Sequence, residues 1–172
     1  GTSIAGKVVI LARISPSKIK LAIVDEGETF TLHRTGQPAT MLPQIPQAYF
    51  LLVGDGNLRQ ELIQQAQRLG LEKRLIFTGS RSDVLQLLQC MDVFVSSSLW
   101  EGLPTVIMET MACQIPVVAT DIPGTRELVQ HQVNGMLVPA AHPEELAQAS
   151  LKLLNSPDLS QRMVQGALDR LP

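Results

Sequence analysis

Residues 96–112 read Ser-Ser-Ser-Leu-Trp-Glu-Gly-Leu-Pro-Thr-Val-Ile-Met-Glu-Thr-Met-Ala, and they are the most informative stretch of the chain for both its fold and its function. They follow the apolar run Val93–Val95, which is typical of a buried parallel strand. A loop of small residues leads into an apolar helix. We predict Pro104 at its first position, because a missing N–H costs nothing there. The open N–H groups of that first turn, with the positive end of the helix dipole, favour an anion such as phosphate.

Two carboxylates lie on either side of this predicted anion-binding site. Glu101 is in the loop, and Glu109 is on the second turn of the helix, four residues after Thr105 and so on the same face. The other helix residues are apolar nearly all round, which predicts a largely buried helix. A buried carboxylate needs partners, which the hydroxyls of a polyhydroxylated ligand would supply. Taken alone, the two acids are equally well explained as a solvated loop residue and a helix residue in an ion pair.

The residues around the two acids resemble the motif of retaining glycosyltransferases of family 4. That motif is a Glu, seven residues and a second Glu, with Glu-Gly-Leu-Pro at its start and Met-Glu-Thr-Met-Ala at its end; Glu101 and Glu109 occupy the two acidic places. Members of the family have two Rossmann domains in the GT-B architecture, and the motif belongs to the C-terminal, nucleotide-sugar-binding domain. The resemblance implies that Glu101 contacts the donor sugar and that Glu109 holds the ribose hydroxyls.

The start of the helix contributes backbone groups to the same expected site. Backbone N–H groups of the loop and first turn would meet phosphate or sugar oxygens, whereas Pro104 has no N–H to donate. The residues concerned are Gly102, Leu103, Thr105 and Val106.

A second group of candidate residues follows residues 7–12, whose uninterrupted apolar run predicts a central parallel strand. Family 4 has Gly-Arg-Leu, three residues and Lys-Gly at this turn, and its Arg and Lys hold the donor diphosphate. Arg13 and Lys18 match, whereas Ala12 and Ile19 replace the glycines. Fixed cations suit the charge that develops on a leaving nucleoside diphosphate. Without the resemblance, two basic residues after a strand indicate only a solvated loop.

The resemblance fails over residues 19–42, where the family has an amphipathic helix. Here two β-rich runs flank an acidic turn at Gly27, which predicts a hairpin. The glycine and prolines that follow argue against a long helix before the next strand. Three explanations of this departure stay open: a divergent insertion, a rebuilt segment or a damaged site. The direction in which the Lys18 side chain points depends on which of them is right.

From residue 48 onward strands and helices alternate again. We predict strands over 48–53, 74–78, 92–95 and 116–120, and a turn with a short edge strand within 133–139. We predict helices over 57–69, 84–89, 143–154 and 158–168, and a turn into a short helix over 121–127. The turn after the strand at 48–53 contains Gly54 and Gly56. The pair is half of a dinucleotide-binding fingerprint, but Arg59 replaces the third glycine. The resemblance places Gly54 at the donor-side crevice.

The loop after the strand at 74–78 is the expected position of the nucleotide base. The resemblance puts the base against Gly79 and the residues that follow it. Arg81 could stack on the face of the base, although from the residues alone a surface arginine at the start of a helix is the favoured interpretation.

Composition limits the classes of function. The 172 residues are 45% hydrophobic and 17% charged, which suits one well-packed α/β domain and is too short for two Rossmann domains. A net charge of −2 gives no reason to expect nucleic acid as a partner. No apolar run approaches the roughly 20 residues that span a membrane. Cys90 and Cys113 lack metal-ligand spacing and have apolar neighbours, which predicts buried thiols in a reducing, cytoplasmic setting.

We therefore expect residues 1–172 to form one doubly wound, Rossmann-like α/β domain with a mostly parallel sheet, half of a GT-B architecture. The resemblance implies that it binds a nucleotide diphosphate sugar, without a metal or other cofactor, for a retaining glycosyltransferase that transfers a hexosyl group. The acceptor would be held by an N-terminal domain that this chain lacks, so the chain alone should be inactive. A peripheral membrane contact of the parent enzyme stays open.

Three alternatives also stay open. The first is an enzyme of the nucleotide-sugar epimerase type, built on the same double-Rossmann plan. The second is a non-catalytic domain that keeps the shape without binding a donor. The third is a dinucleotide-binding redox domain that depends on Gly54 and Gly56.

Overall fold

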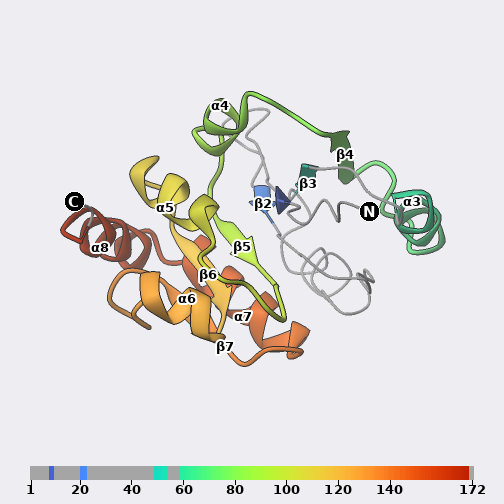
Figure 1. The fold of residues 1–172 in the computed structure, drawn as a ribbon. Coiled ribbons are helices and arrows are strands. Elements are labelled where there is room, and N and C mark those ends of the chain that lie inside the picture. The colour runs from blue at the N-terminus through green and yellow to red at the C-terminus, as the bar shows by residue number, and fades with distance from the viewer. Residues whose placement is uncertain (1–7, 10–19, 23–48, 54–58, 171–172) are drawn as a thin grey trace.

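The computed structural model describes residues 8–9, 20–22, 49–53 and 59–170 (Figure 1). Strands and helices alternate along most of the described chain. The strands are β1 (Val8–Val9), β2 (Lys20–Ala22), β3 (Tyr49–Val53), β4 (Leu75–Gly79), β5 (Phe94–Ser96), β6 (Val117–Thr120) and β7 (Met136–Val138). The helices are α3 (Arg59–Arg68), α4 (Val84–Leu88), α5 (Thr105–Ala112), α6 (Pro123–Leu128), α7 (Pro143–Leu154) and α8 (Pro157–Leu168).

The strands form two hydrogen-bonded groups that adjoin. β3 pairs with β4 on one side and with β2 and β1 on the other, and β5, β6 and β7 pair in that order. β5 also lies next to β1 and β2, so the order across the domain is β4, β3, β2 with β1, β5, β6, β7 (Figure 1). β1 and β2 occupy one position beside β3. If they are counted together and the positions are numbered in chain order, the strand order is the 3-2-1-4-5-6 order of a doubly wound fold. The predicted fold class is confirmed in its topology.

Most pairs are parallel, with one exception. β2 and β4 run parallel to β3, and β5, β6 and β7 run parallel to one another. β1 instead pairs antiparallel with β3, with Val8 opposite Val53. The predicted parallel direction of the strand over residues 7–12 is therefore wrong. An uninterrupted apolar run indicates burial on both faces, and burial does not determine direction.

One core of buried hydrophobic side chains extends across both strand groups, from Phe50 of β3 to Val138 of β7. Every residue of β5 and β6 is buried, as their continuous apolar runs predict. α7 packs on β6 and β7, and α5 packs on β6 and on α8. The largest fully buried side chains include Phe94 of β5, Ile107 of α5 and Leu153 of α7.

α5 differs from its prediction in two ways. Pro104 precedes the helix as its N-cap residue and is not its first helical residue. The helix is also less buried than expected: Ile107, Thr110 and Met111 are buried, whereas Ala112 is exposed. The buried residues are three or four apart, so α5 packs through one face only. Apolar composition all round the helix could not show which face packs.

The predicted hairpin and the predicted burial of the two cysteines are each only partly matched by the described residues. β2 falls on the first run of the predicted hairpin and pairs in parallel with β3, while the turn and second run lie outside the described residues. Cys113 is half-buried, but Cys90 is exposed, so its predicted burial is wrong. Cys90 lies just after α4, where Leu88 takes the buried position.

Candidate functional site

The candidate site lies where β5 and β6 end. Both strands are parallel, so their carboxyl ends lie at the same edge of the sheet. The loop of residues 97–104 follows β5, and a tight turn into α6 follows β6. In the order of the strands, the chain reverses direction between β2 and β5, and such switch points are where doubly wound sheets bind ligands. The loop after β5 begins at that switch point.

Glu101 is held firmly within this loop. Its side chain is only 7% exposed, and its Oε1 accepts a hydrogen bond from Ser98 Oγ, which is itself fully buried. A carboxylate in such a place is orientated before any ligand arrives. The predicted role of Glu101 needs this fixed orientation.

Glu109 lies on the second turn of α5 and is half-buried. Thr105 is one turn before it and exposed, and Cys113 is one turn after it. The pKa of the Cys113 thiol is raised, first by burial and then by the negative charge of Glu109. The three residues therefore share one face of the helix, and the exposed end of that face is the end nearer the loop.

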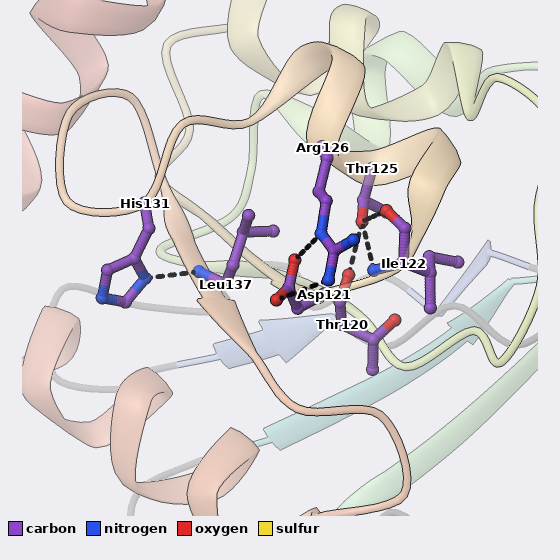
Figure 2. A network of polar contacts seen from close by, with 7 residues as sticks. All are labelled: Thr120, Asp121, Ile122, Thr125, Arg126, His131 and Leu137. Atoms are coloured by element: carbon purple, nitrogen blue, oxygen red, sulfur yellow. Dashed lines mark hydrogen bonds and ion pairs between the residues drawn. The ribbon is translucent and has the colours of Figure 1, made fainter.

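The turn after β6 is fixed by Thr125 (Figure 2). Thr125 Oγ1 lies 2.5 Å from the carbonyl oxygen of Thr120, to which it donates, and accepts a hydrogen bond of 3.2 Å from the N–H of Ile122. Next to it, Arg126 forms an ion pair with Asp121 through Nε at 2.5 Å and Nη2 at 3.1 Å. The hydrogen bond from Arg126 lowers the pKa of the Asp121 carboxyl.

This turn contacts the Glu101 loop directly. Thr120 Oγ1 donates a hydrogen bond of 2.5 Å to the carbonyl oxygen of Ser98. A Cβ atom on Gly124 would lie 2.2 Å from the carbonyl oxygen of Gly102 and 2.5 Å from that of Glu101. Since side-chain carbons never approach oxygen so closely, only glycine permits this packing.

Sequence reasoning missed Ser98, Thr120 and Gly124. The signal available was slight: Thr120 ends one apolar strand run and Ser98 is the third of three serines after the other, and one sequence does not show which residues they contact. Their contacts span 22 residues in the case of Thr120 and Ser98.

The predicted base-side residues lie at the end of β4. Gly79 has a φ of +69°, a left-handed conformation that glycine adopts without strain. Arg81 forms an exposed, two-point ion pair with Asp83, at 2.7 Å from Nε and 2.5 Å from Nη2. Its hydrogen bonds lower the pKa of Asp83. Such in-plane bonds leave the faces of the guanidinium open for stacking.

The other predicted site residues lie partly in the exposed part of the loop and helix start and partly outside the described residues. Gly102, Leu103 and Thr105 are exposed and Val106 is half-buried, so these residues are open to solvent although Glu101 beside them is buried. Arg13, Lys18 and Gly54 lie outside the described residues. Within the described segments, no group of three or more His, Cys, Asp or Glu side chains could hold a metal ion. The helices described are all too short or too polar to cross a bilayer.

Comparison with known proteins identifies the family. Residues 37–170 match the family described as glycosyl transferases group 1. The Vi polysaccharide biosynthesis protein VipC/TviE of Salmonella typhi is 39% identical over 111 residues, which are 64% of this chain and 19% of that protein. The UDP-Gal:alpha-D-GlcNAc-diphosphoundecaprenol alpha-1,3-galactosyltransferase of Escherichia coli is 39% identical over 95 residues, 55% of this chain and 24% of that enzyme.

A solved structure agrees with the fold. The crystal structure of Anabaena Alr3699/HepE in complex with UDP-glucose superimposes with a TM-score of 0.76 at 31% identity, covering 88% of this chain and 43% of that one. The chain thus spans about a fifth to less than half of the length of these relatives. Its α/β, Rossmann-like class is confirmed. Because the family match covers most of the sequence, the chain belongs to the glycosyl transferases group 1 family.

Proposed function

We propose that this chain is the C-terminal, donor-binding domain of a retaining glycosyltransferase of family 4, in a GT-B architecture. Its ligand is a nucleotide diphosphate sugar. Membership in the group 1 family supports this, and so do the UDP-Gal named for the Escherichia coli relative and the UDP-glucose bound to Alr3699/HepE. The single observation that carries the proposal is the buried, pre-orientated carboxylate of Glu101 at the switch point of the sheet.

Each acidic residue has a separate task in the proposed complex. Glu101 accepts hydrogen bonds from hydroxyls of the donor sugar, and its hydrogen bond from Ser98 keeps one oxygen in place. Glu109, on the accessible face of α5, accepts the ribose hydroxyls. Charge-assisted hydrogen bonds of this kind are stronger than those between neutral groups.

The diphosphate lies between the start of α5 and the basic residues that follow β1. The N–H groups of the loop and first turn, from Gly102 to Val106 apart from Pro104, face the phosphate or sugar oxygens. Arg13 and Lys18 add positive charge. During transfer, the bond from the anomeric carbon to the diphosphate oxygen breaks, a bond to the acceptor oxygen forms with retained configuration, and the proton of the acceptor hydroxyl passes to the leaving diphosphate. The cations and N–H groups stabilise the leaving diphosphate, so no metal is required.

The base and the acceptor complete the proposal. Gly54 and Gly79 border the nucleotide, and the open face of Arg81 stacks on the base. A separate N-terminal domain holds the acceptor and closes over the donor, so the chain alone binds the donor but does not transfer the hexosyl group. We place the parent enzyme in the cytoplasm. Family membership favours this function over the epimerase, redox and non-catalytic alternatives.

Calorimetric titration of this chain tests the proposal. The ligands are uridine, guanosine and adenosine diphosphates and their sugar conjugates, and the proteins are the wild type, Glu109→Ala and the control Glu144→Ala. Glu144 is exposed in the first turn of α7. We expect saturable binding to one nucleotide series, weakened about tenfold or more in Glu109→Ala and unchanged in the control. Absence of binding to every ligand would refute the proposal.

A further inference from the structure

A chain of buried contacts joins the turn after β6 to the carboxylate of Glu101. Thr125 Oγ1 donates to the carbonyl oxygen of Thr120, Thr120 Oγ1 donates to the carbonyl oxygen of Ser98, and Ser98 Oγ donates to Glu101 Oε1. All four residues are buried. These hydrogen bonds are therefore shielded from water, and loss of the Thr120 hydroxyl leaves the buried carbonyl oxygen of Ser98 without the group that bonds it.

The packing of Gly124 forms a second, independent support. The first turn of α6 lies so close to the Glu101 loop that a Cβ on Gly124 would meet the carbonyl oxygens of Gly102 and Glu101 at 2.2 and 2.5 Å. Both atoms belong to backbone, so neither can move aside without moving the loop. The position of the loop thus depends on the absence of a side chain at residue 124.

We propose that Thr120 and Gly124 are positioning residues that set the place of the Glu101 carboxylate and so determine how strongly the site binds the sugar part of its donor. The inference rests on the proposed function for its ligand. Neither residue touches the donor; each acts through the loop. The nucleotide part is held elsewhere, by Glu109 on α5, so loss of either support weakens sugar recognition and leaves nucleotide binding intact.

The binding test compares UDP-glucose with UDP in four variants. Thr120→Val removes the hydroxyl at nearly constant volume, Thr120→Ser retains it, and Gly124→Ala introduces the clash. Gly166→Ala is the matched control, because a Cβ there would lie 2.3 Å from the carbonyl oxygen of Val133, an equally tight backbone contact on α8. We expect Thr120→Val and Gly124→Ala to lose about tenfold in affinity for UDP-glucose and less than about twofold for UDP, a separation of about 1 kcal/mol. Thr120→Ser and Gly166→Ala should keep the wild-type ratio.

The tryptophan next to Glu101 provides a readout that needs no ligand. Trp100 is the sole tryptophan of the chain and is 76% exposed, so its fluorescence anisotropy reports the motion of this loop. We expect lower anisotropy in Thr120→Val and Gly124→Ala than in the wild type, and wild-type values in Thr120→Ser and Gly166→Ala. Thermal melts of all variants separate loop motion from general unfolding.

The outcomes distinguish the two proposals. Wild-type anisotropy in Thr120→Val and Gly124→Ala would overturn the positioning role. Equal losses for UDP and UDP-glucose would overturn it as well, because they would show a general structural effect. Lower anisotropy in those two variants, together with a wild type that binds neither ligand, would support the positioning role and refute the proposed function.

Discussion

The carboxylate of Glu109 lies one helical turn before Cys113 and raises the pKa of its thiol, adding to the larger effect of partial burial. The relationship gives a probe of Glu109 that is independent of any donor. Cys113 is half-buried, and Cys90, on the segment after α4, is exposed.

Glu109→Gln is expected to speed alkylation of Cys113 by iodoacetamide at a fixed pH near neutrality. Removal of a nearby negative charge favours the thiolate, which is the reacting form. Because burial is the first cause of the raised pKa, the rate should rise without reaching that of a fully exposed thiol. Peptide mass spectrometry measures both cysteines in one sample, with Cys90 as the internal control. An unchanged rate at Cys113 would show that the two side chains do not face each other.

Asp121→Asn is expected to lower the melting temperature at neutral pH and to have less effect in acid. Arg126 lowers the pKa of Asp121 in the folded protein, so the ion pair stabilises the fold above the ordinary carboxyl pKa. That contribution is lost as the pH falls through the lowered value. Melts of the wild type and the variant from pH 7 to pH 2 measure the change.

The double variant Asp121→Asn with Arg126→Gln is the control for the ion pair. Since both side chains are well exposed, the effect is small. If Asp121→Asn lowers the melting temperature equally in the presence and absence of Arg126, the ion pair is not the cause.

Thr125→Val is expected to destabilise the domain by about 1 kcal/mol, because it removes the hydroxyl that bonds the buried Ile122 N–H and Thr120 carbonyl, which then keep only their 3.0 Å hydrogen bond to each other. Thr125→Ser keeps both hydrogen bonds and should recover most of the loss. Urea unfolding of the three proteins gives the free energies. Equal losses in the two variants would show that the hydroxyl is not the source of the effect, because serine keeps it.

Ile107→Ala is expected to cost about 2–5 kcal/mol in the free energy of unfolding, because the fully buried side chain leaves a cavity in the core. Met108→Ala, on the half-buried side of the same helix, should cost roughly 1 kcal/mol or less. Equal costs would show that α5 is buried all round, as its composition alone suggests.

The sequence predicts the parts of the fold that depend on local pattern. The strands β5 and β6 are buried on both faces and so appear as unbroken apolar runs, and α7 begins at Pro143 and ends at Leu154, as predicted, because proline suits the first turn of an amphipathic helix. The direction of β1 and the half-burial of α5 depend on partners distant in sequence. No local pattern specifies those partners.

The same distinction applies to the candidate site. The two acids and their spacing are local, and the sequence indicates them directly. The hydrogen bond from Thr120 to Ser98 and the fit of Gly124 against Gly102 join segments about twenty residues apart. They are visible only once β5 and β6 are paired. The roles of Arg13, Lys18 and Gly54 remain predictions, since these residues lie outside the described part of the chain.

The most direct test of donor recognition is calorimetric titration of Glu101→Gln with UDP-glucose and UDP. The substitution keeps the size of the side chain and removes its charge. We predict that the variant binds UDP as the wild type does but loses the added affinity for UDP-glucose, by about tenfold. If Glu101→Gln binds UDP-glucose as tightly as the wild type, the buried carboxylate does not hold the donor sugar, and the central claim is wrong.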